Sequence, residues 1–313
     1  MKRFVNIIIA IAASSASAFD SEAWLLKRGE ISRAAAALKR SYAECAAKVS
    51  EPAENVTIPV ESHPDGSVKS SVFAKKAQLF LESGLVWGEG VVVRDFREDG
   101  TLAARIDAEN CVVDRNAKSG WAQGKVKAVY NGTTLEGEGV YLSFAREFVL
   151  ITDKAKISSM EFDVGRRGKE SGKAKALTTL TSRRADYDRK EGVVMFEDGV
   201  SLVNPEYKFA SDRLFAFLSG TNELKRVVAI GNVSVADASN RGTCDRAVFV
   251  RSKSRVTMYA GQNGTPARLV DTGRRDSGRN SLEGEKISFW LDSEQVEVEN
   301  SRIFVDPGGK LKL

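Results

Sequence analysis

Acidic residues recur along the chain in one local context, and paired carboxylates can do chemistry. The stretches "LEGEGVYLSF", "FASDRLFAFL", "GTCDRAVFVR" and "LEGEKISFWL" each place a small residue before an acid and an apolar residue two positions after it. The acids are Glu138, Asp212, Asp245 and Glu285. Two such carboxylates could hydrolyse a glycosidic bond. Because the repetition singles out no pair, it favours a repeated structural role over catalysis.

Other catalytic chemistry has little support in the sequence. The single histidine, His63, lies in a proline-rich stretch, so Ser-His-Asp catalysis and multi-histidine metal sites are disfavoured. We expect no catalytic residues, no metal and no cofactor. The three cysteines, Cys45, Cys111 and Cys244, form no CxxC motif and are interpreted as small buried apolar residues.

The N-terminus is typical of an exported protein. Lys2 and Arg3 precede an apolar run and the small residues Ala16-Ser17-Ala18, which predicts a signal peptide over residues 1–18. We expect cleavage and a periplasmic protein, with an uncleaved inner-membrane anchor as the alternative. The net charge of +5 indicates a mildly basic surface, and nucleic-acid binding is not expected.

Helical periodicity is confined to the stretch after the signal peptide. From Ser21 to about Val49, apolar residues recur every three to five positions, namely Leu26, Ile31, Ala35, Leu38, Tyr42 and Cys45. This amphipathic helix is either a partner or membrane-surface helix or, as we favour, a helix that caps the end of the next domain. With the proline-rich linker of residues 50–67, it makes up the segment 19–67.

Short alternating runs punctuated by Gly, Asn or Asp begin at Val68 and predict an all-β architecture of repeated rungs. We expect a first β unit over 68–163, a basic glycine-rich loop over 164–178, a second β unit over 179–306 and a tail over 307–313. In each rung the small residue allows the chain to turn, the acid faces water and alternate apolar residues face a shared interior.

That interior is either an ordinary packed core or an open groove that accepts hydrocarbon, because both produce the same alternation. The candidate groove residues are Phe196, Leu202, Phe209, Leu214, Phe215, Phe217, Val228, Ile230, Phe249, Met258 and Phe289. The loop "GRRGKESGK" supplies Arg166, Arg167 and Lys169 as candidates for contact with anionic head groups, although a solvated loop is the simpler interpretation.

Residues 185–235, "ADYDRKEGVVMFEDGVSLVNPEYKFASDRLFAFLSGTNELKRVVAIGNVSV", resemble the OstA-like domain of the lipopolysaccharide-transport proteins. The similarity is greatest to their periplasmic A component and continues to about residue 306. Residues 68–160, with "LAARIDAENCVVD", resemble the C component.

The resemblance implies a twisted, V-shaped β-jelly roll, an antiparallel sandwich whose two sheets enclose a greasy groove. It also implies a non-catalytic lipid-binding function in outer-membrane biogenesis, carrying the acyl chains of lipid A between the inner and outer membranes. The implied partners are lipopolysaccharide, further jelly-roll proteins or copies joined head to tail through end strands, an inner-membrane ABC transporter and an outer-membrane barrel complex.

Two alternatives from other classes stay open. One is an exported structural or adhesive β-solenoid with a closed core. The other is a polysaccharide-acting enzyme that uses two of the repeated acids.

Overall fold

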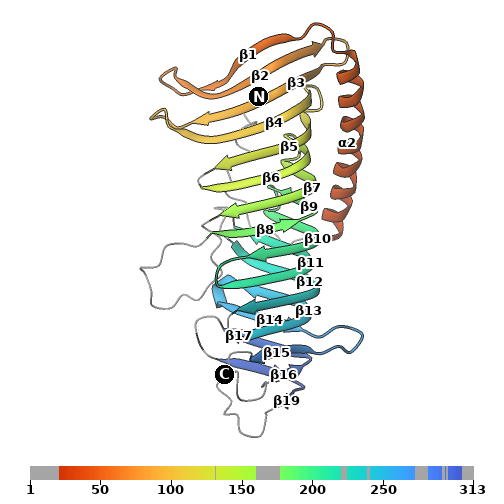
Figure 1. Ribbon diagram of the computed structural model, residues 1–313, viewed down its shortest axis with the longest axis vertical. Helices are drawn as coiled ribbons and strands as arrows, with labels where there is room; N and C mark the ends of the chain where they lie inside the picture. Colours follow the sequence, from red (N-terminus) through yellow and green to blue (C-terminus); the bar gives the residue numbers. More distant parts are fainter. Residues whose placement is uncertain are drawn as a thin grey trace. The chain divides into compact units, whose positions relative to one another are not determined.

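A computed structural model describes residues 21–130, 132–159, 177–219, 224–237, 240–271, 281–290, 293 and 295–304. One α-helix is followed by antiparallel strands, which confirms the predicted all-β class with an N-terminal helix (Figure 1). No helix in this part of the chain is long and apolar enough to cross a membrane. The predicted signal peptide and tail, and nearly all of the loop 164–178, lie outside the described residues.

The chain divides into two compact units. The first contains helix α2 and most of the N-terminal strands: α2 (Ser21–Lys48), β1 (Ala53–Ser62), β2 (Val68–Phe80), β3 (Leu85–Phe96), β4 (Leu102–Asp114), β5 (Ser119–Tyr130), β6 (Thr133–Ser143), β7 (Phe148–Ser159) and β9 (Arg184–Asp188). The second contains β8 (Thr178–Ser182), β10 (Val193–Val203), β11 (Tyr207–Leu218), β12 (Leu224–Asp237), β13 (Asn240–Val250), a 3-10 turn (Arg251–Lys253), β14 (Arg255–Tyr259), β15 (Ala267–Asp271), β16 (Ser281–Gly284), β17 (Lys286–Trp290), β18 (Val296–Glu299) and β19 (Arg302–Phe304). Strand β9, within the segment expected to form the second unit, therefore belongs to the first.

The proline-rich stretch expected to be a linker is mostly a strand. Residues 53–62 form β1, which pairs antiparallel with β2, and Pro59 lies opposite Ser71. Proline is compatible with a strand at the edge of a sheet, where its missing N–H is not needed by a second neighbour. The prediction of a linker was wrong because the three prolines remove backbone N–H donors without preventing the strand from pairing along one edge.

In the second unit, strands β11, β12 and β13 each contribute to two sheets. The second half of β13 pairs with β14, which pairs with β17, whereas its first half pairs with β15, which pairs with β16. We call these the β14 sheet and the β15 sheet. They face each other, since a Cβ atom built on Gly242 of the β15 sheet would lie 3.1 Å from Cε of Met258 in the β14 sheet.

The repeated acids mark the corner where the strands pass from one sheet to the other. On β11, Asp212 and Arg213 are consecutive exposed residues between the buried Ser211 and Leu214. Two successive side chains point outward here and interrupt the alternation. Because of this interruption, the apolar side chains before and after the corner both point toward the interior.

Four of the corner acids contact a left-handed residue, or its neighbour, further along the chain. Asp212 accepts a hydrogen bond from Nδ2 of Asn232 at 2.9 Å, beside Gly231, and both of these residues have positive φ. Likewise, Glu109 accepts from the Lys125 backbone N–H next to Gly124, Glu138 pairs with Lys154, and Glu285 pairs with Asn300. The acids therefore hold the bend of successive hairpins together.

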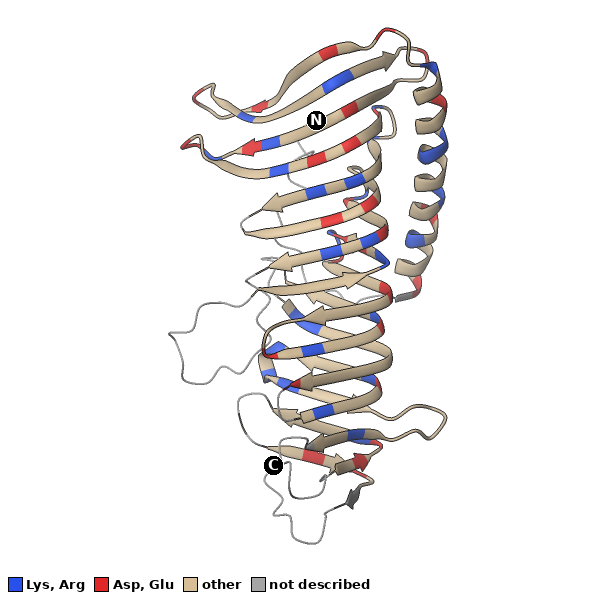
Figure 2. Cartoon of the chain, viewed as in Figure 1, with Lys and Arg blue, Asp and Glu red and all other residues tan. Residues whose placement is uncertain are grey.

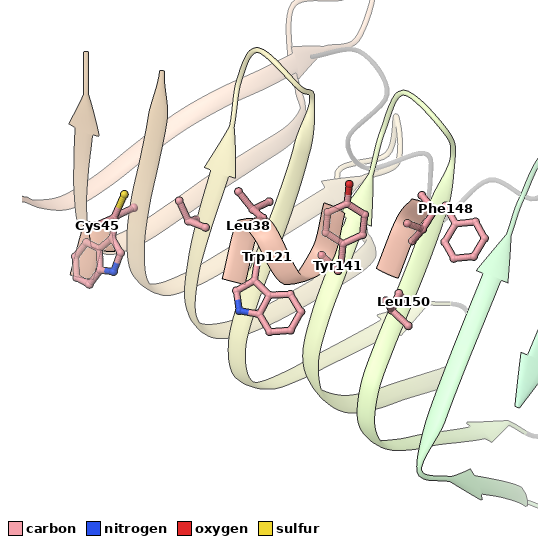
Figure 3. Close-up of a cluster of buried hydrophobic side chains, with 10 residues drawn as sticks. Leu38, Cys45, Trp121, Tyr141, Phe148 and Leu150 are labelled. Atoms are coloured by element: carbon pink, nitrogen blue, oxygen red, sulfur yellow. The ribbon is translucent and has the colours of Figure 1, made fainter. Parts of the chain in front are cut away.

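In the first unit, helix α2 covers the outer face of one sheet. Its buried residues, Trp24, Ile31, Ala35, Leu38 and Cys45, follow heptad spacing. Four of them, Ile31, Ala35, Leu38 and Cys45, pack on a strand row that includes Trp87, Val112, Trp121, Tyr141 and Leu150 (Figure 3). The helix thus covers a sheet face instead of capping the end of the domain. Leu26, which was expected in the buried stripe, is 69% exposed.

Candidate apolar trough

The inner face of the second unit carries two apolar rows on the β14 sheet. Cross-strand pairing aligns a corner row of Leu214, Ala229, Ala247, Met258, Ile287 and Val298. It also aligns a rim row of Ala216, Val227, Phe249, Val256, Phe289 and Val296. Most of the corner row is buried, whereas from Val227 to Val296 the rim row is partly exposed. Burial therefore decreases with distance from the corner.

The facing β15 sheet follows the same gradient. Val233, Cys244 and Ala267 are buried near the corner, and they form one hydrophobic cluster with Met258 and Ile287 of the β14 sheet. The next row contains Phe209, Val235, Gly242, Leu269 and Leu282. Of these, Phe209, Val235 and Leu269 are partly exposed. The two sheets therefore pack together at the corner and present apolar side chains toward the rim.

The structure separates the candidate groove residues by face. Leu214, Met258, Phe209, Phe249 and Phe289 lie on the inner faces. Phe215, Phe217, Val228 and Ile230 lie on the outer face of the β14 sheet, since Phe215 pairs with Val228 and Ile230 pairs with the exposed Arg213. Phe196 and Leu202 lie on β10, where Phe196 is buried and Leu202 pairs with Leu180. The head-group candidates Arg166, Arg167 and Lys169 lie outside the described residues.

The first unit has apolar inner faces that the sequence interpretation did not include among its site residues. Val140 and Leu142, on the face opposite α2, form a cluster with Phe144, Val149 and Tyr187. A separate cluster on the other sheet contains Val72, Val93, Ala104, Ile106 and Tyr130. The same alternation that marked the second unit was present here, but without many phenylalanines.

Three buried polar atoms line these inner faces of the first unit without a hydrogen-bond partner, namely Ser70 Oγ, Asp95 Oδ1 and the Tyr187 hydroxyl. Ser70 and Asp95 lie opposite each other on β2 and β3. Desolvation raises the pKa of the Asp95 carboxyl, although Lys69 opposes this effect. Desolvation also raises the pKa of the Tyr187 hydroxyl to about 12.

The cysteines behave as small apolar residues of the scaffold. All three thiols are free, and Cys45 and Cys244 are buried as expected, whereas Cys111 is partly exposed. Desolvation raises the pKa of Cys111 and of Cys244 to about 12, and it also raises the pKa of Cys45. Such thiols stay protonated and are poor nucleophiles or metal ligands.

The outer face of the first unit that is not covered by α2 alternates in charge from strand to strand (Figure 2). Acids on β4 and β6 alternate with lysines on β5 and β7, and a hollow of about 700 Å³ lies over this face. Glu136 lies 3.0 Å from Lys156 and 3.7 Å from Lys127, and Glu138 lies 2.9 Å from Lys154. Because the two signs neutralise each other across the strands, this surface fixes strand register instead of selecting one charge of ligand.

His63 has a structural contact in the first unit. Its Nε2 atom lies 3.1 Å from the Phe96 carbonyl oxygen, in the turn between β1 and β2.

No protein-family model matches the chain, and no curated protein matches it. Among solved structures, the chain is similar to LptH, the LptA-homologous periplasmic component of the lipopolysaccharide transport device from Pseudomonas aeruginosa. The identity is 14%, the match covers 42% of this chain and 95% of that chain, and the TM-score is 0.35. The likeness is distant and concerns the fold alone.

Proposed function

We propose that this chain is a periplasmic lipid carrier that holds the acyl chains of lipopolysaccharide between its facing sheets. The observation that carries the proposal is the burial gradient of the second unit. Most apolar residues next to the corner are buried, whereas Phe249, Val256 and Phe289 of the rim row are partly exposed.

A closed sandwich would bury this row, because the two inner faces would interdigitate along their whole width. An apolar surface left partly in water favours hydrocarbon, and each buried CH₂ group of an acyl chain contributes about 0.8 kcal/mol. The gradient therefore supports an open trough over the closed β-solenoid.

The environment of three of the four repeated acids supports a non-catalytic function. Glu138, Asp212 and Glu285 each contact a residue further along the chain at the corner, as Glu109 of β4 also does. These acids are engaged at their own hairpins, which accounts for their repetition without an active site.

The location and the partners are part of the same proposal. The signal peptide predicted over residues 1–18 would deliver the chain to the periplasm. There it would receive lipopolysaccharide from an inner-membrane ABC transporter and pass it toward an outer-membrane barrel complex. Further jelly-roll proteins or copies of the chain would join head to tail through end strands, since an unpaired strand edge can accept another strand.

Site-specific photocrosslinking in cells tests the proposal. A photoreactive residue at Phe249 or Phe289, on the inner face, should capture lipopolysaccharide. The matched control is Val250, which follows Phe249 on the same strand but faces outward. Capture from Phe249 and not from Val250 is the expected result. Equal capture from both, or capture from Val250 alone, would overturn the proposal.

A further inference from the structure

The outer face of the second unit has a row equivalent to the one that α2 covers in the first. Aligning the corner acids Glu109 and Asp212 places Val112 in the position of Phe215. Aligning Gly124 with Gly231 places Trp121 in the position of Val228, and aligning Glu138 with Asp245 places Tyr141 in the position of Val248. The cross-strand pairing agrees with this alignment. In the first unit Trp121 lies opposite both Val112 and Tyr141, and in the second unit Val228 lies opposite both Phe215 and Val248.

The two rows differ in how well they are covered. Val112, Trp121 and Tyr141 are only 0%, 2% and 4% exposed beneath α2. Val228 and Val248 are partly exposed, although they are smaller than the residues they replace. We call the surface formed by Val228, Val248, Val250 and Trp290 the outer patch.

Arginines lie beside and within the outer patch. Arg213 and Arg246 lie toward the corner, whereas Arg226 is opposite Val250, and Arg255 lies between Val250 and Trp290 toward the strand ends. Arg226 stacks on the Phe217 ring at 4.2 Å, and Arg255 lies 6.0 Å from the Trp290 ring centroid. The Arg255 Nε atom has no hydrogen-bond partner. An apolar row between guanidinium groups suits a partner with an apolar stripe flanked by carboxylates.

In the first unit, the charged contacts of the helix run in both directions. Lys27 of the helix pairs with Asp188, and Lys39 lies 5.7 Å from the Trp121 ring centroid, whereas Glu30 of the helix pairs with Arg146. In the second unit the strands supply the cations. The occupant of the outer patch should therefore be acidic.

We propose that the outer patch binds an acidic amphipathic helix of another protein, in the way that α2 covers the first unit. The segments of this chain outside the described residues do not have an acidic composition. In residues 1–20, 160–176, 272–280 and 305–313, lysines and arginines outnumber the acids. A helix bound in this way contacts the patch through its apolar residues at heptad spacing.

Peptide titration tests the proposal on the full chain. The probe is a three-heptad helical peptide with leucine at the a and d positions and glutamate elsewhere, and its counterpart has lysine in place of glutamate. Fluorescence anisotropy should show saturable binding of the acidic peptide only. The double substitution Arg226→Glu with Arg246→Glu should weaken binding by about tenfold or more.

The matched control is Arg241→Glu. Arg241 is also exposed in the second unit, but it belongs to the β15 sheet, where it pairs with Ala236 and Val270. This variant should bind the acidic peptide as the unmodified chain does. Equal affinity for both peptides, or an equal loss in the control, would overturn the proposal. Binding to anionic lipid vesicles through Arg226 and Arg246 without peptide binding would overturn it in favour of a membrane surface.

Discussion

The Nζ atom of Lys27 lies 2.6 Å from Oδ2 of Asp188, although the two residues are 161 positions apart. Next to this pair, Nε of Arg28 donates a hydrogen bond to Oδ2 of Asp186. Asp188 is 0% exposed, whereas the Lys27 side chain keeps 24% of its surface in water. The acids of the "ADYD" stretch are thus held against the sheet by cations from α2.

Replacing Lys27 with methionine should destabilise the first unit by about 3 kcal/mol, because it leaves the buried Asp188 carboxylate without its cation. Asp188→Asn should cost less, about 1 kcal/mol, since Lys27 can turn toward solvent. Urea denaturation of both variants gives the free energies of unfolding that check this prediction. A larger loss for Asp188→Asn than for Lys27→Met would contradict this asymmetry.

Gly231→Ala should destabilise the corner of the second unit by about 2 kcal/mol. Gly231 has φ of +78°, and a Cβ atom there would clash with the Asp212 carboxylate. Gly66→Ala serves as a control, because Gly66 has φ of +86° with nothing near its Cβ position. That variant should cost about 1 kcal/mol, which isolates the backbone strain. Equal losses of thermal stability in the two variants would show that the acid exerts no steric effect.

Asp95→Asn should stabilise the protein at neutral pH. The folded state holds the Asp95 pKa above its ordinary value of 3.8 because burial disfavours the carboxylate. The folded state therefore binds more protons than the unfolded state in the window above pH 3.8, and stability falls as pH rises through it. Above that window the penalty is constant, and below pH 3.8 it disappears. Unfolding free energies at pH 7 and pH 3.5 should show a gain for the variant at pH 7 only, and a gain of equal size at both would argue against a titration effect.

Cys111 and Cys244 should resist alkylation by iodoacetamide in the native protein. With pKa values of about 12, only about one thiol in ten thousand is ionised at pH 8. Mass spectrometry should show both residues unmodified until urea unfolds the chain. Rapid native labelling of either cysteine would mean that its side of the corner opens to solvent.

Several features followed from local sequence because short-range physics decides them. The small–acid–apolar stretches around Asp212 and Glu138 marked the corners, since a bend needs a small residue and an outward polar neighbour. The apolar spacing of residues 21–49 likewise predicted the helix that ends at Lys48. In contrast, β1 was missed because strand pairing along an edge depends on a neighbour that the local sequence does not reveal.

A helix followed by repeated antiparallel rungs can be predicted from the amino-acid sequence, because periodicity and turn chemistry are local properties. The sequence does not reveal which apolar residues share a face, since that depends on how the strands bend and pair. Phe215 and Phe249 have similar sequence surroundings, yet Phe215 faces outward and Phe249 faces the trough. The corner interrupts the alternation by one residue, so the face of each side chain depends on where its strand bends and on the register of its neighbours.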